Sequence, residues 1–285
     1  MDNLFSGLEA FGLDKLSGVE IYEKEKENAA GNAETVSKPA FSEADNIYDK
    51  TFSCPVCDKE FKTKVVKYGK IKLENLDSDL RPIYQNMDPL KYDAIVCPHC
   101  GYAALSRFFR NVTSTQADLV RKNISVVFKG LQEKGDILEY DDAIARHKLA
   151  LLSSVVKKAK TSERAYTCLK TAWVIRGKAE KLSKDLPDYK AQKESLEKEE
   201  LDFISKAYDG FCEAFSKESF PMCGMDEVTM MLLLAELARK TGKYEEASRW
   251  VSRILVSREA KDRIKEKARE IKELIREHKG NDSNE

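Results

Sequence analysis

Apolar residues recur every three or four positions through most of the chain after residue 113, which is the spacing of amphipathic helices. Thr161-Ser162-Glu163 offers a capping residue and an acidic first turn at the start of one stripe, and Asp226 is suited to cap another. The pattern therefore predicts six helices, at about residues 144–155, 161–176, 204–215, 228–240, 243–256 and 264–275.

Shorter apolar runs, typical of strands, replace these stripes in the segment before residue 113. The candidate strands lie near residues 65–66, 71–73 and 94–96. A small α+β module is therefore expected over residues 47–112, followed by a helical domain over residues 113–280. The fold class that this organisation predicts is mainly α.

The N-terminal part has weaker patterning. Leu4, Phe5, Leu8 and Phe11 have a loosely helical spacing, and residues 1–21 are predicted to form a short amphipathic arm. Residues 22–46 are polar and show no sustained period, which favours a flexible linker. Residues 3–16 of the arm are expected to dock on the protein itself or to recruit a partner. The alternative is a disordered terminus whose apolar residues have no role.

Composition narrows the class of protein. The chain has 285 residues, and its 49 Lys and Arg balance 49 Asp and Glu, so no chain-wide positive field attracts nucleic acid or anionic lipid. No apolar run approaches the roughly 20 residues of a membrane span. The first residues lack the features of a signal peptide, and the seven cysteines are an odd number. These observations together favour a cytoplasmic protein without a disulfide framework.

The clearest chemical signal is a pair of C-x-x-C motifs. Cys54 and Cys57 form the first pair, Cys97 and Cys100 form the second, and 39 residues separate the pairs. Two such knuckles supply the four thiolates that a tetrahedral zinc ion requires, and a proline follows the first cysteine of each. Gly101 suits the left-handed conformation that closes a knuckle. One Zn²⁺ per chain is therefore predicted, in a zinc-ribbon-like module.

Four cysteines would close the coordination shell, so the predicted zinc is structural rather than catalytic. His99 lies between the last two ligands and is expected to be an exposed imidazole, not a fifth ligand. A different interpretation takes Cys97-Pro98-His99-Cys100 as a thioredoxin-like redox dithiol, followed by a helical run over residues 102–109. That alternative leaves the first cysteine pair without a role.

Nucleic-acid binding is the usual alternative for a zinc ribbon. Residues 49–110 contain eleven basic and eight acidic residues, and a zinc ion with four thiolates would reduce this small excess further. A local run of lysines lies within residues 62–72 with Tyr68 inside it. Lysines on a solvated edge strand, where they prevent pairing with other chains, explain the same run without nucleic acid. A nucleic-acid partner is therefore not favoured.

Residues 228–255 match the tetratricopeptide pattern of a helical hairpin. Small Ala235 and Ala247 occupy the positions of close helix contact, Gly242 marks the turn, and Trp250 supplies bulk. The C-terminal domain is therefore predicted to be helical-repeat-like.

Other residues favour structural interpretations. His147 lies on an apolar stripe and is expected to be a core histidine. Trp173 and Arg176 fit a buried indole with a guanidinium at its rim. The remaining cysteines have no metal spacing and are expected to be buried small hydrophobes: Cys168, Cys212 and Cys223. Since no nucleophile elbow, phosphate loop or dinucleotide motif is present, no enzymatic activity is predicted.

The CPVC and CPHCGYA motifs, with Tyr84, Pro89 and Tyr92 before the second and Ala172-Trp173 after it, resemble the bacterial family designated domain of unknown function 2225. The resemblance covers about residues 48–255. It implies a zinc-ribbon-like module followed by tetratricopeptide-like helices, with the four paired cysteines as metal ligands and no established activity.

These inferences converge on an uncharacterised zinc-binding protein that acts in protein interaction or scaffolding, with a protein partner. The alternative function is a zinc-ribbon nucleic-acid-binding or regulatory factor.

Overall fold

The computed structural model describes residues 41–130 and 135–282. The predicted arm, residues 1–21, and the part of the predicted linker before residue 41 lie outside this range. The end of that linker contacts the rest of the protein: the Glu43 carboxylate accepts a hydrogen bond from Tyr92 at 2.6 Å and pairs with Lys91 at 2.7 Å. Within the described ranges, no helix is long and apolar enough to cross a membrane.

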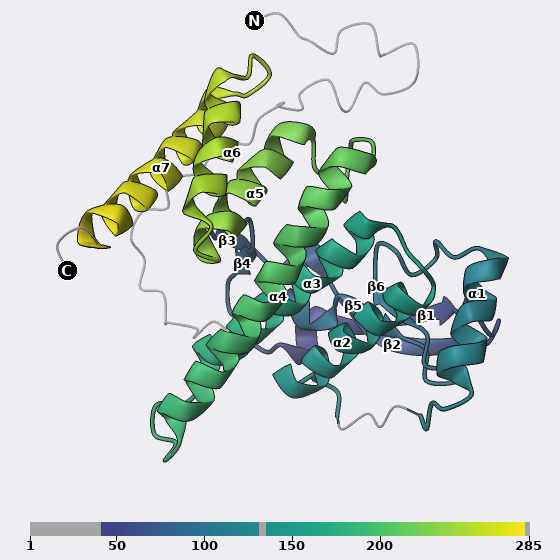
Figure 1. The fold of residues 1–285 in the computed structure, drawn as a ribbon. Coiled ribbons are helices and arrows are strands. Elements are labelled where there is room, and N and C mark those ends of the chain that lie inside the picture. Colours follow the sequence, from purple (N-terminus) through teal and green to yellow (C-terminus); the bar gives the residue numbers. More distant parts are fainter. Residues whose placement is uncertain (1–40, 131–134, 283–285) are drawn as a thin grey trace, which may run out of the picture. The chain divides into compact units, whose positions relative to one another are not determined.

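The strands form three antiparallel pairs, which lie in succession along the chain (Figure 1). These pairs are β1 (Ile47–Ser53) with β2 (Glu60–Val66), β3 (Leu73–Leu76) with β4 (Pro82–Tyr84), and β5 (Ala94–Val96) with β6 (Ala103–Leu105). β5 coincides with the strand predicted at residues 94–96. Along β2, Phe61 and Thr63 are buried while Lys62 between them is exposed, because alternate side chains of a strand point to opposite faces.

One local expectation was wrong. Residues 103–105 form strand β6, whereas the redox-dithiol interpretation needs a helix after the second cysteine pair. All three residues of β6 are buried. Ala103 and Leu105 pack with β5 against Ala150, and Ala104 packs on the other face in the cluster around the cysteines. Burial on both faces produces a continuous apolar run, and such a run does not distinguish a strand from a helix by periodicity.

The remainder of the described chain is mainly helical, as predicted. The helices are α1 (Ser114–Val120), α2 (Tyr140–Val156), α3 (Thr161–Lys181), α4 (Tyr189–Lys217), α5 (Glu227–Lys240), α6 (Tyr244–Val256) and α7 (Asp262–Asp282). Helices α2, α3 and α4 pack on one another in sequence order, and α5, α6 and α7 do the same (Figure 1). α4 begins well before its predicted start at residue 204. The prediction missed the first turns because they are polar and bury only Leu196 in the core, so they show no apolar stripe.

The helix ends show where local rules hold and where they fail. Asp226 caps α5 as predicted, and its carboxylate accepts a hydrogen bond from the Thr229 backbone N–H at 2.7 Å. Thr161 does not cap α3. Instead, the Glu218 carboxylate, at the end of α4, accepts hydrogen bonds from both the backbone N–H and the hydroxyl of Ser162. A free backbone N–H at the start of α3 is therefore hydrogen-bonded by a residue 56 positions away along the chain.

The α5–α6 hairpin has the close packing that its sequence predicts. Ala235 and Ala247 are completely buried, and Gly242 at the turn has a φ of 73°. Val251 and Ile254 on α6 point into the same core. The small alanines bring the two helix backbones together, and the glycine supplies the left-handed turn without a steric cost.

Buried apolar residues fall into separate clusters. The largest joins helices α2 to α7 and contains Leu169, Phe211 and Leu233. A second cluster surrounds the four paired cysteines and includes Phe109 and Val120. Because the helices have a core of their own, the region around the cysteines is a distinct packing unit within the fold.

A buried ionic cluster attaches the β3–β4 hairpin to the helices. Asp79, in the turn between the two strands, is completely buried and pairs with Arg176 of α3 and with Lys240 of α5 at 2.9 Å. Arg176 also pairs with Asp77 at 3.0 Å and with Glu200 of α4 at 2.7 Å. The aspartate turn thus pairs with side chains from α3 and α5, and Arg176 links it to Glu200 of α4.

Candidate metal centre

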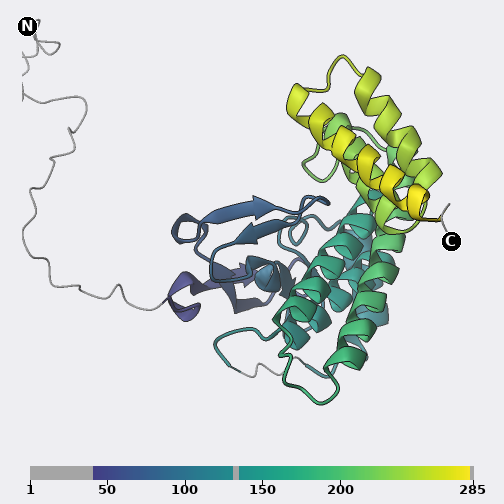
Figure 2. The same ribbon diagram turned by 90° about the vertical axis from the view of Figure 1, so that its left-hand side faces the viewer.

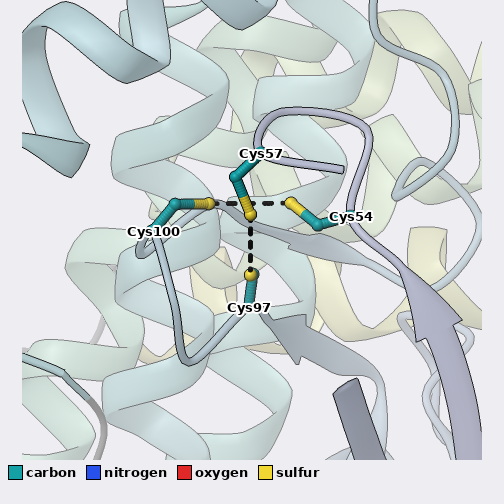
Figure 3. Close-up of side chains that lie close together, drawn as sticks. All are labelled: Cys54, Cys57, Cys97 and Cys100. Carbon is teal, nitrogen blue, oxygen red and sulfur yellow. Dashed lines mark hydrogen bonds between the residues drawn. The ribbon is translucent and has the colours of Figure 1, made fainter. Parts of the chain in front are cut away.

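The two predicted knuckles occupy the tips of two β-hairpins. Cys54 and Cys57 lie in the turn between β1 and β2, and Cys97 and Cys100 lie in the turn between β5 and β6. Figure 3 shows the four sulfur atoms pointing toward a common centre, two from each turn. The fold therefore brings together all four cysteines that the sequence analysis singled out.

The knuckles share one backbone geometry. In the first, the Asp58 N–H donates to the Cys54 carbonyl at 2.9 Å; in the second, the Gly101 N–H donates to the Cys97 carbonyl at 3.0 Å. Gly101 has a φ of 74°, the left-handed conformation predicted for it, and Asp58 at the corresponding position of the first knuckle has a φ of 59°. A Cβ on Gly101 would come within 2.6 Å of the Phe128 ring, so this position excludes a side chain for two reasons.

The sulfur positions fit a single tetrahedral metal ion. The Sγ atoms of Cys54 and Cys100 are 3.6 Å apart, those of Cys57 and Cys97 are 3.7 Å apart, and all four lie within 4.8 Å of one another. A tetrahedron with metal–sulfur bonds of about 2.3 Å has sulfur–sulfur edges of about 3.8 Å. A disulfide bond would bring two sulfurs to about 2.05 Å, and the cysteines are free. The arrangement could therefore hold a metal ion with four thiolate ligands.

The site is closed to solvent on most sides. Cys54 and Cys97 are completely buried, Cys100 is nearly so, and Cys57 is half-buried. Aromatic rings of Phe52, Phe61 and Phe109 pack against one another beside the cysteines, with ring centroids about 6 Å apart. Phe52 and Phe61, which flank the first knuckle in the sequence, thus cover part of the cysteine cluster.

The thiols influence one another strongly. Hydrogen bonds from the Cys100 and Cys54 thiols lower the pKa of Cys97, whereas hydrogen bonds to Cys100 and Cys97 raise the pKa of Cys54. Four ionised thiolates at this separation would repel one another, so without a cation the cluster retains protons. A divalent cation would remove this penalty, because metal binding displaces the thiol protons.

His99 is exposed, and its Nε2 atom lies 3.2 Å from the Glu60 carbonyl oxygen. The imidazole is therefore outside the sulfur cluster, as predicted. The first cysteine pair is part of the cluster, and strand β6 follows the second pair, so neither structural requirement of the redox-dithiol interpretation is met.

Two residues that support the site were missed by the sequence analysis. The Arg121 side chain, in a π-helical turn (Arg121–Ser125) after α1, donates to the Val56 carbonyl of the first knuckle at 2.7 Å. The Lys157 side chain is 1% exposed, pairs with Glu163 at 2.8 Å and lies 5.7 Å from the centroid of the Tyr102 ring. Nothing in the local sequence distinguishes these two from the many solvated cations of the chain.

The lysine run at residues 62–72 is partly neutralised by its neighbours. Lys64 pairs with Asp49 at 3.1 Å and with Asp136 at 3.3 Å. Lys67 donates to the Asp45 carbonyl at 3.0 Å. Tyr68 within the run is 55% exposed. Two lysines of the run thus have partners within the protein.

The other candidate residues do not form a second site among the described residues. His147 is buried, with its Nδ1 atom 2.8 Å from the Ala143 carbonyl, and burial lowers its pKa. Trp173 is buried, as predicted. The side chain of Arg176, predicted at the rim of this indole, is 12% exposed and lies in the ionic cluster with Asp79. Cys168 is buried, and the half-buried thiols of the remaining two cysteines are likewise outside the metal-ligating group: Cys212 and Cys223.

Fold and site together define a mainly helical protein with a four-cysteine cluster that could hold a metal ion. The family model described as an uncharacterized protein conserved in bacteria (DUF2225) matches residues 47–275. The match spans most of the chain, including both knuckles, and the chain therefore belongs to this family. No curated protein and no solved structure matches the chain.

Proposed function

We propose that the protein is a protein-interaction or scaffolding module in which one structural Zn²⁺, bound by Cys54, Cys57, Cys97 and Cys100, stabilises a zinc-ribbon-like unit. The observation that carries the proposal is the buried tetrahedral arrangement of four sulfurs, which leaves no open position for water or substrate. Tetrahedral thiolate sites suit zinc, and the same donor set also accepts iron.

The helical part supports the interaction role. Helices α5, α6 and α7 pack as consecutive antiparallel neighbours, and the α5–α6 hairpin has the small-residue contacts of a tetratricopeptide unit. Helical-repeat domains present extended surfaces to segments of other proteins. We therefore infer a tetratricopeptide-like domain whose partner is a protein, in the cytoplasm.

Metal analysis and partner capture test this proposal. Protein purified from its native cell should contain about one equivalent of zinc, as four ligands around one centre require. Affinity capture of the full-length chain, followed by mass spectrometry, should recover a defined set of proteins that a nuclease treatment does not remove. An iron-containing site would refute the choice of metal, and a set of proteins lost on nuclease treatment would refute the interaction role.

Nucleic-acid binding makes a different prediction. Because Lys64 and Lys67 already have partners, we expect only weak, non-specific binding to a single-stranded oligonucleotide at about 0.15 M salt, with a shallow salt dependence. Fluorescence anisotropy over a salt series measures both quantities. Tight binding that falls steeply with salt, and that disappears when Lys64, Lys67 and Lys70 are changed to Glu, would establish the zinc-ribbon nucleic-acid alternative instead.

A further inference from the structure

A groove lies between strand β3 and helix α7, with Leu232 of α5 also contributing to its lining. Its volume is about 490 Å³, within the range of about 300–1,000 Å³ that ligand sites occupy. Buried Leu232 and Ile271 give it apolar surface, while Leu73 and Leu274 are 47% and 42% exposed at its sides. The groove is separate from the cysteine cluster, since no residue that lines it belongs to that cluster.

The groove follows the free edge of β3. All four residues of the strand, Leu73–Leu76, line it, although alternate side chains of a strand point to opposite faces. The pairing with β4 is irregular between Leu73 and Asn75, which changes the direction of some side chains. A groove over one face of the strand would still not contact every residue, so the groove lies along the strand edge. β4 occupies the other edge, and in the described chain no strand pairs with β3 on the groove side.

One backbone donor at this edge is bonded to a side chain that lines the groove. The Leu76 N–H donates to the side-chain oxygen of its neighbour Asn75 at 2.8 Å. Asn75 is exposed and lines the groove, so a rotation of its side chain would release this N–H. Edge strands with such unpaired groups are templates for a further strand.

The α7 wall carries two cations without partners. Arg263 and Lys267 lie one helical turn apart and both line the groove, yet neither forms an ion pair or hydrogen bond with any described residue. By contrast, Arg276 on the same helix pairs with Glu273 at 2.8 Å. Two adjacent unpaired cations favour a carboxylate ligand. Glu74 and Glu270 also line the groove, so an acidic group is favoured only near the two cations.

We propose that this groove binds an extended peptide segment of a partner protein, which adds to β3 as a new strand. Its main chain pairs with the β3 edge, its apolar side chains cover Leu232 and Ile271, and an acidic side chain lies against Arg263 and Lys267. An extended segment is favoured over a helix because only an extended backbone can pair with a strand edge along its length. This inference rests on the proposed interaction function and specifies the chemistry of the partner.

Selection of random peptides displayed on phage, with the full-length protein as bait, tests the inference. Selected peptides should carry apolar residues at alternate positions and at least one acidic residue. Their affinity for the Arg263→Glu, Lys267→Glu double variant should fall by about tenfold or more, since both favourable charge contacts become repulsive. The matched control is Arg269→Glu with Lys272→Glu, two exposed cations of α7 outside the groove, which should leave the affinity unchanged.

The backbone pairing has its own control. N-methylation of one alternating set of peptide amides should abolish binding, and methylation of the other set should preserve it, because only alternate N–H groups face the neighbouring strand. Enrichment of no peptide, equal sensitivity to both methylation sets, or full affinity for the groove double variant would overturn the inference. A wild-type dimer that the double variant abolishes in sedimentation analysis would assign the groove to a second copy and also overturn it.

Failure of this inference is distinguishable from failure of the proposed function. If the groove double variant still captures the same set of cellular proteins as the wild type, the protein is an interaction module that uses another surface. If neither form captures proteins, the interaction function itself is wrong.

Discussion

Cys97→Ser is expected to release the metal and to unfold both knuckles together with α1, while helices α4 to α7 remain folded. Structural zinc contributes about 10–16 kcal/mol of apparent binding free energy in small zinc modules at pH 7. That is comparable to the whole stability of a typical domain, about 5–15 kcal/mol. We therefore expect the apolar cluster around the cysteines to depend on a bound metal, whereas the cluster that joins α2 to α7 does not contain the cysteines of the knuckles.

Hydrogen exchange with metal analysis measures this outcome. Amides of β1, β2, β5, β6 and α1 should lose protection in the variant, and those of α4 to α7 should keep it. Cys212→Ser is the matched control, because this half-buried cysteine lies outside the cluster and its loss should leave the metal content unchanged. Full metal retention by Cys97→Ser would contradict the assignment of this residue as a ligand.

Asp79→Ala is expected to lower the free energy of unfolding by about 3–5 kcal/mol, the range for breaking a buried ion pair by removal of one partner. The substitution leaves Arg176 and Lys240 without their buried carboxylate. Urea denaturation of the variant and the wild type measures the difference. Asp141→Ala is the control: its carboxylate is 78% exposed and pairs with Lys178 alone among the described residues, so we expect a cost of less than about 1 kcal/mol. Equal costs for the two substitutions would show that the ionic cluster does not stabilise the fold.

The same carboxylate predicts a pH dependence. Burial acts to raise the pKa of Asp79, but the hydrogen bond and charge of Arg176 and the charge of Lys240 outweigh it and lower the pKa well below its usual range. A depressed folded pKa stabilises the protein above the unfolded pKa of about 3.9, and this contribution is lost as the pH falls below that value. Asp79→Asn should therefore lose less stability than the wild type between pH 5 and about pH 3 in urea titrations.

The knuckles could be predicted from sequence because their determinants are local. Each turn is specified within a few residues, by two cysteines with two residues between them and by a glycine or aspartate directly after the second cysteine. Both turns form. The helical stripes were also predictable, since one apolar face records the helix period. The family match agrees with the resemblance drawn from the same motifs.

Long-range partnerships were not predictable. Asp79 lies in a polar stretch, and its partner Lys240 is 161 positions away, so neither residue carries a signal of the other. The start of α3 is a similar case. Thr161 fits the local capping rule, but its hydroxyl does not cap the helix; the Glu218 carboxylate at the end of α4 accepts the hydrogen bond of the Ser162 N–H instead. The cap therefore depends on tertiary packing and not on the local sequence. The exposed edge of β3 has the same limitation, because only the fold shows that β4 covers one side and α7 faces the other.

The position of the β3–β4 hairpin between the two cysteine pairs has a topological consequence. A metal bound by both knuckles would join Cys57 to Cys97 and turn the 39 intervening residues into a closed ring of chain. The β3–β4 hairpin belongs to this ring, and Figure 2 shows the strands drawn in blue beside the helices. A single proteolytic cut within this ring would leave both fragments linked through the metal. A longer ring would lower the stability only slightly, since doubling the length of a flexible loop costs about 0.6 kcal/mol in closure entropy. Insertions should therefore be tolerated in the exposed connections of the ring, whereas the two-residue spacing inside each knuckle has no such freedom.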